Sequence, residues 1–167
     1  LIASGFLVTS NHVIPTPEEA SDAHFYLDGE QFGFAPEDGF LTDNGLDVTI
    51  VAIDSLAKEV AAEHALGTLS DLSFAYEPEQ FETVQIVFSV RDHTQTVPAT
   101  VQGVGDSRWL HYVLDDEAES SQLLGGPVVN ANGRVVAINQ EHSNSAARGV
   151  QMQAIATRFA DEILSLQ

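Results

Sequence analysis

Residues 122–129 read Gln122-Leu123-Leu124-Gly125-Gly126-Pro127-Val128-Val129, which predicts a tight turn that leads into a strand. Glycine adopts backbone dihedral angles that other residues resist, so we expect the chain to bend sharply here and to present bare N–H groups. Directly afterwards, Ala131-Asn132-Gly133 separates two apolar runs, and Asn-Gly in that position is typical of a hairpin. The stretch therefore predicts a loop with unpaired N–H groups followed by a β-hairpin.

Short β-branched runs occur along the rest of the chain. We expect strands on both sides of Ser4-Gly5 and, further on, over 46–53, 81–90, 94–104 and 109–114. Pro98 predicts that its strand lies at a sheet edge or contains a bulge. Thr16 followed by Pro17 predicts the start of a helix. A last helix is expected over about 156–166 because Phe159, Ile163 and Leu166 fall on one face.

Three motifs occur in an order that is typical of one family. Thr9-Ser10-Asn11-His12-Val13 follows two predicted strands, Asp47 begins a buried run, and Gly125-Gly126-Pro127 precedes the hairpin. In this order the chain resembles the trypsin-like (chymotrypsin-fold) serine peptidases, above all their bacterial glutamyl-endopeptidase-like branch. The resemblance implies an all-β fold of two antiparallel, six-stranded-type β-barrels and a C-terminal helix, with the first strand missing before Leu1. It places the N-terminal barrel at about 1–65, the C-terminal barrel at about 75–155 and the helix at about 156–166.

The same resemblance implies a role for each motif residue. His12 would be the general base and Asp47 the carboxylate that orients it, although a competing register puts Glu18 at the histidine position. The nucleophile position holds Leu124, whose side chain has no nucleophilic atom, and Gly125 belongs to the oxyanion region. We therefore expect a catalytically inactive pseudoprotease and not an enzyme.

Two alternatives retain chemistry. In the first, an active serine endopeptidase uses Ser121 or Ser120 in a shifted register, although neither is followed by a glycine whose N–H would help to hold the oxyanion. In the second, a metal is held by His12, Asp47, Glu18 and His24. No ligand motif such as His-Glu-x-x-His occurs, so we expect no metal and no cofactor.

The charge of the chain limits its partners. Asp and Glu number 25 against 6 Lys and Arg, for a formal net charge of −19. Such a chain repels phosphate backbones and anionic membranes. No apolar run approaches the ~18 residues of a membrane helix. We expect no nucleic acid and no membrane insertion, but a protein or peptide partner. Glu117 and Glu119, beside a cleft lined by Gln122, Asn139 and Gln140, would favour a basic peptide.

The chain starts at Leu1 and contains no cysteine. A start without Met indicates a piece of a longer protein, whose other domains are then partners in the same polypeptide, and the resemblance implies that this protein is bacterial. The absence of thiols fits a cytoplasmic as well as a bacterial secreted location and does not separate them. The leading hypothesis is an inactive domain that binds or scaffolds other proteins.

Overall fold

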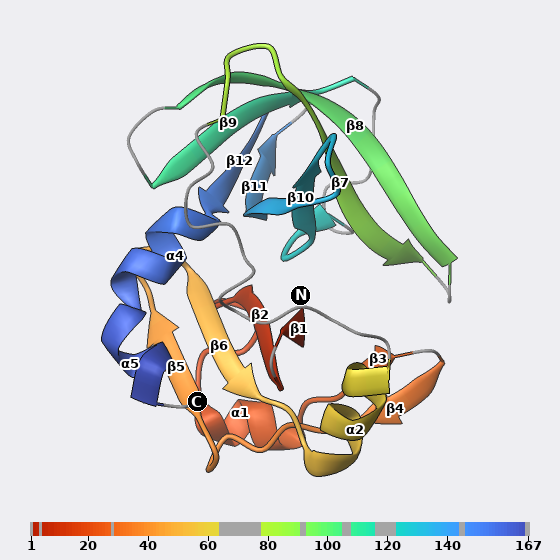
Figure 1. Ribbon diagram of the computed structural model, residues 1–167, viewed down its shortest axis with the longest axis vertical. Coiled ribbons are helices and arrows are strands. Elements are labelled where there is room, and N and C mark those ends of the chain that lie inside the picture. The colour runs from red at the N-terminus through yellow and green to blue at the C-terminus, as the bar shows by residue number, and fades with distance from the viewer. Residues whose placement is uncertain are drawn as a thin grey trace. The chain divides into compact units, whose positions relative to one another are not determined.

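A computed structural model describes residues 2–3, 5–27, 29–63, 78–90, 93–104, 108–115, 123–143 and 146–165. Strands dominate, and the chain divides into two compact units (Figure 1). The first unit comprises Leu1–Asp71 with Phe159–Gln167, and the second comprises Leu72–Arg158.

The first unit is built on an antiparallel sheet with the strand order β1-β2-β6-β5. Its central strand β6 (Val48–Ala52) is buried along its whole length, as expected from its β-branched sequence. The other strands of this sheet are β1 (Ile2–Ala3), β2 (Phe6–Ser10) and β5 (Phe40–Asp43). A separate hairpin pairs β3 (Phe25–Leu27) with β4 (Glu30–Phe32).

Two short helices accompany these strands, α1 (Pro17–Asp22) and α2 (Ser55–Glu63). The predicted cap of α1 is confirmed, because the Thr16 hydroxyl accepts a hydrogen bond of 3.2 Å from the Glu19 N–H. Glu18, the histidine substitute of the competing register, lies exposed in the first turn of this helix. This placement gives the competing register no support.

The second unit is a closed antiparallel barrel with the strand order β10-β11-β12-β9-β8-β7. The predicted hairpin is confirmed, since β10 and β11 pair across a turn in which Gly133 has a φ of +74°. Buried residues form one core, and along β7, β8 and β9 they occupy alternate positions (Val84, Ile86, Val97, Ala99, Val101, Leu110, Tyr112, Leu114, Leu123, Val128, Val136, Ala137 and Ala147). The barrel strands are β7 (Thr83–Val90), β8 (His93–Val104), β9 (Trp109–Leu114), β10 (Pro127–Asn130), β11 (Val135–Ser143) and β12 (Ala146–Gln151).

The fold class predicted from the sequence is confirmed as a mostly β chain with a closed six-stranded barrel and a C-terminal helix. Three details differ. In the first unit, the described strands form a four-stranded sheet and a hairpin, not a closed barrel. Strand β8 pairs with both neighbours, so it is not an edge strand; the other predicted possibility, a bulge in this strand, agrees with the register shift between Val101 and Gly103, which lies beyond Pro98. The final helix begins earlier than predicted and is divided into α4 (Met152–Arg158) and α5 (Ala160–Ser165).

Candidate functional site

His12 and Asp47 lie side by side in the first unit, although 35 residues separate them in the sequence. They meet because β2 and β6 pair antiparallel with Ser10 opposite Val48, so the end of one strand adjoins the start of the other. The Asp47 Oδ2 atom is 2.7 Å from His12 Nδ1, and its Oδ1 accepts a 2.9 Å hydrogen bond from the His12 backbone N–H. Both carboxylate oxygens of Asp47 therefore hold the histidine.

This contact determines how the imidazole can act. An ionised carboxylate only accepts hydrogen bonds, so Nδ1 is the nitrogen that carries the proton toward Asp47. The neutral ring then has its lone pair on Nε2, which is the nitrogen a general base uses. The side chains of His12 and Asp47 are 47% and 30% exposed, so the pair lies at the protein surface.

The backbone around the pair is fixed by polar groups that the sequence analysis did not single out. Asp47 has a φ of +52°, a left-handed conformation that Asp tolerates better than most residues. Next to His12, the buried Asn11 amide donates to the hydroxyls of Thr42 and Thr49, and the Thr49 hydroxyl donates to the Ile14 carbonyl at 2.8 Å. The sequence feature that could have indicated these polar contacts is Thr49, a polar residue within the apolar run of β6, because a buried hydroxyl needs a hydrogen-bond partner.

The loop from Leu123 to Gly126 lies in the second unit, at the start of β10. Gly125 has a φ of +73°, which confirms that the turn requires glycine. The bare N–H groups predicted at the two glycines are not found, however. Gly125 donates to the Asn139 carbonyl at 2.8 Å and Gly126 to the Leu123 carbonyl at 3.1 Å. These bonds hold the shape of the loop and leave neither glycine N–H available to an oxyanion.

Asn139 on β11 supports this loop from inside the barrel. Its side-chain amide donates to the Leu123 carbonyl at 2.9 Å, and its Oδ1 accepts a hydrogen bond from the Tyr112 hydroxyl. Burial raises the pKa of the Tyr112 phenol above its ordinary value, so Tyr112 remains a donor. Asn139 and its neighbour Gln140, predicted from the sequence as cleft residues, are both buried, and Asn139 contacts the loop instead of the solvent.

Leu124, at the predicted nucleophile position, is 38% exposed, whereas Leu123 beside it is buried in the barrel core. The alternative nucleophiles Ser120 and Ser121 and the predicted cleft residues Glu117, Glu119 and Gln122 lie outside the described residues. The His12–Asp47 pair and the Leu124 loop belong to different units. The pair and the loop are therefore described separately, each within its own unit.

Comparison with known proteins gives a result only at the level of structure, since no family model and no curated protein sequence matches the chain. A crystal structure of the Rv3671c protease in its inactive form superposes with a TM-score of 0.68 at 18% identity, over 96% of this chain and 80% of that one. The serine endoprotease of Yersinia pestis gives a TM-score of 0.69 at 16% identity, over 99% of this chain and 56% of that one. A serine-to-alanine mutant of Rv3671c from M. tuberculosis gives 0.68 at 19% identity, over 100% of this chain and 80% of that one.

This is the trypsin-like serine protease fold. The finding corrects one prediction. We expected a chain that is not an enzyme, and this expectation is contradicted, because the solved structures that share its fold are of serine proteases. The prediction rested on one side chain, Leu124, and extended its lack of a nucleophilic atom to the whole domain.

The described residues of this serine protease fold add two observations on other classes of site. They contain no group of three His, Asp or Glu residues that could hold a metal ion, so His12, Asp47, Glu18 and His24 are not brought together as such a group. In the same part of the chain, no helix is both long enough and apolar enough to span a membrane.

Proposed function

We propose that this chain is a peptide-directed serine hydrolase domain in which His12 is the general base and Asp47 orients it. The observation that carries the proposal is the double contact of the Asp47 carboxylate with the ring and the backbone of His12. This contact fixes the orientation of the His12 ring and so supports a general base whose Nε2 lone pair has a defined direction. A histidine that served only to solubilise the surface would not need two such contacts.

The proposed reaction is acyl transfer through a serine hydroxyl. The hydroxyl oxygen attacks the carbonyl carbon of the peptide bond while Nε2 of His12 takes its proton, and the Asp47 carboxylate stabilises the imidazolium. The same proton then passes to the leaving amine as the C–N bond breaks, and water hydrolyses the acyl-enzyme by the reverse sequence. Leu124 has no nucleophilic atom, so the hydroxyl is assigned to Ser121 or Ser120.

A fluorophosphonate probe tests this assignment, because it labels an activated serine. We expect one adduct by intact mass, mapped by peptide sequencing to Ser121 or Ser120 and lost in the matching alanine variant. His12→Gln should slow the labelling by about 10³-fold or more, since the hydroxyl loses its base. Wild-type protein that stays unlabelled, beside a Leu124→Ser variant that becomes labelled, would refute the shifted nucleophile.

A second candidate function is the binding of a protein or peptide partner. It is favoured by the exposed Leu124 in the loop, because an exposed apolar side chain on a loop held rigid by hydrogen bonds suits contact with a partner. The charge of the chain favours a basic partner. Fluorescence anisotropy with labelled basic and acidic peptides tests this, with Leu124→Asp as the loop variant. Equal binding by the variant and the wild type would exclude the loop as the contact.

A further inference from the structure

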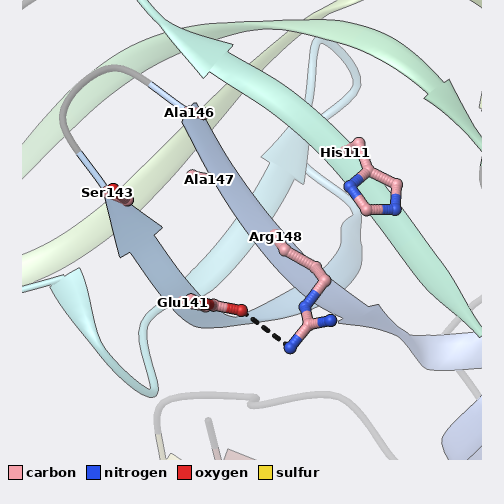
Figure 2. A pocket seen from close by; sticks show the side chains of 6 residues that line it. All are labelled: His111, Glu141, Ser143, Ala146, Ala147 and Arg148. Carbon is pink, nitrogen blue, oxygen red and sulfur yellow. Dashed lines mark ion pairs between the residues drawn. The ribbon is translucent and has the colours of Figure 1, made fainter.

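A pocket of about 220 Å³ lies on the wall of the barrel in the second unit (Figure 2). It is formed by the strands β9, β11 and β12, which are neighbours in the barrel. Burial alternates along β9, with Tyr112 inside and His111 exposed, so the pocket opens on the outer face. Its lining residues are His111, Glu141, Ser143, Ala146, Ala147 and Arg148.

Arg148 occupies the middle of this site. The strand register places His111 opposite it on β9 and Glu141 opposite it on β11. Its guanidinium carbon lies 4.3 Å from the ring centroid of Trp109, and its Nη2 is 2.7 Å from Glu141 Oε2. A cation over an indole face is attracted by the ring, so Trp109 holds the guanidinium in place from one side.

The contact between Arg148 and Glu141 does not use all the hydrogen-bond donors of the guanidinium. Only one nitrogen of the guanidinium reaches the carboxylate, and the Glu141 side chain is 62% exposed, so the ion pair is a weak one. The Arg148 Nε–H is buried and has no acceptor among the described residues. A carboxylate that takes the Nε–Nη edge of an arginine makes two parallel hydrogen bonds, which are stronger than the single contact present here.

The remaining lining groups also suit an anion. His111 and Ser143 bring a ring N–H and a hydroxyl to the same pocket, and both can donate hydrogen bonds. Among the described lining residues, Glu141 is the one acid, and its carboxylate contacts the Arg148 guanidinium as the carboxylate of a bound ligand would. The net charge of −19 disfavours a polyanion, so a ligand with a single carboxylate is the best match.

We propose that this pocket binds one carboxylate group, from an acidic peptide side chain or a small carboxylic acid, with Arg148 as its receptor and Glu141 as an internal competitor. The inference goes beyond the hydrolytic function and does not depend on it. It also makes a prediction opposite to the basic preference expected from Glu117 and Glu119, which lie outside the described residues. One set of titrations with acidic and basic ligands distinguishes the acidic preference from the basic one.

Trp109 is the one tryptophan of the chain and reports directly on Arg148, so the test is a fluorescence titration of the whole chain at about 0.15 M salt. The ligands are N-acetylglutamate methylamide as the peptide-like acid, butyrate as the free acid, N-acetylglutamine methylamide as the neutral analogue and N-acetyllysine methylamide as the base. We expect a saturable change with the peptide-like acid and none with the neutral or basic analogue. Butyrate that binds equally well assigns the site to free carboxylic acids, and weaker binding of butyrate assigns it to peptide side chains.

Three variants of the pocket and one control variant sharpen the result. Arg148→Gln should weaken binding by about 10-fold or more, because a charge-assisted hydrogen bond is lost, and Arg148→Lys should recover only part of it, because lysine lacks the fork. Glu141→Gln should tighten binding by about two- to five-fold, since it removes the internal competitor. Arg134→Gln, at an exposed arginine in the β10–β11 turn, is the charge-matched control and should leave binding unchanged.

Three results would overturn the proposal. The first is the absence of a saturable change with both carboxylates, and the second is a change that persists in Arg148→Gln. The third is binding of the lysine analogue that Glu141→Gln abolishes, which would make Glu141 the receptor for a cation. The fluorophosphonate experiment does not depend on any of these outcomes, so the two proposals can fail separately.

Discussion

Replacement of Asn139 by leucine should destabilise the barrel strongly, although the two side chains are similar in volume. Asn139 is fully buried and joins two other buried groups, the Tyr112 hydroxyl and the Leu123 carbonyl. Leucine can pair with neither of them. Asn139→Leu therefore leaves the Tyr112 hydroxyl without a partner and removes one of the two hydrogen bonds that the Leu123 carbonyl accepts, the other coming from the Gly126 N–H.

The size of the effect follows from these two groups. The unpaired Tyr112 hydroxyl destabilises by about 1–3 kcal/mol, and the hydrogen bond lost at the Leu123 carbonyl contributes about 0.5–1.5 kcal/mol. Burial of an apolar side chain in place of an amide offsets part of this, and we expect a net loss of about 2 kcal/mol in the free energy of unfolding. For a chain of this size, such a loss lowers the Tm by about 4–8 °C.

Urea unfolding followed by Trp109 fluorescence measures this loss, because Trp109 lies in the same barrel. Tyr112→Phe is the matched single variant, since it leaves only Asn139 Oδ1 unpaired, and we expect about 1–2 kcal/mol. The double variant should be more stable than the sum of the two losses predicts, because the unpaired hydroxyl disappears. An Asn139→Leu protein within about 0.5 kcal/mol of wild type would refute the argument that this network holds the loop.

Three further predictions concern Tyr112 in the barrel, Asp47 beside His12 and Gly126 in the loop before β10. Because burial raises the pKa of Tyr112, the free energy of unfolding should be constant up to the unfolded-state pKa near 10 and should fall above it, by up to about 1.4 kcal/mol per pH unit. Urea titrations at several pH values measure this fall. The same dependence on pH in Tyr112→Phe would exclude Tyr112 as its source. Asp47→Asn should keep the Tm within a few degrees because Asn tolerates the φ of +52°, whereas Asp47→Val should lower stability by about 1–2 kcal/mol; equal stability of the two variants in thermal unfolding would contradict the strain argument. Gly126→Ala places a Cβ 2.7 Å from the Val87 carbonyl oxygen and should destabilise by about 1–3 kcal/mol in urea; wild-type stability would mean that the loop can move away.

Much of the fold could be predicted from residues that are close together in the sequence. The Thr16 cap, the Asn132-Gly133 hairpin and the positive φ of Gly125 were all predicted and found. In each of them, one side chain or one glycine determines the local backbone, so neighbouring residues suffice. The unpaired glycine N–H groups were not found, because Gly125 donates to the Asn139 carbonyl of another strand and Gly126 donates to the Leu123 carbonyl within the loop.

The candidate site could be predicted in part. The sequence motifs named His12 and Asp47 by resemblance, and the structure brings the two side chains together. The sequence did not indicate that Asn139 is buried and supports the Leu124 loop. A polar residue in a strand has the same sequence pattern whether it faces solvent or a buried tyrosine. Nor did the sequence single out Arg148, whose environment comes from Trp109 on one strand and Glu141 on another.

By itself, the sequence determined the all-β class, the turns and the acidic charge, since these depend on composition and on dihedral preferences within a few residues. Only the tertiary structure decided which distant side chains meet. The register of β2 on β6 brings His12 to Asp47, and the register of β12 between β9 and β11 sets Arg148 between His111 and Glu141. The physical reason is that side chains alternate along a strand, so a shift of one residue would turn each of these groups to the opposite face.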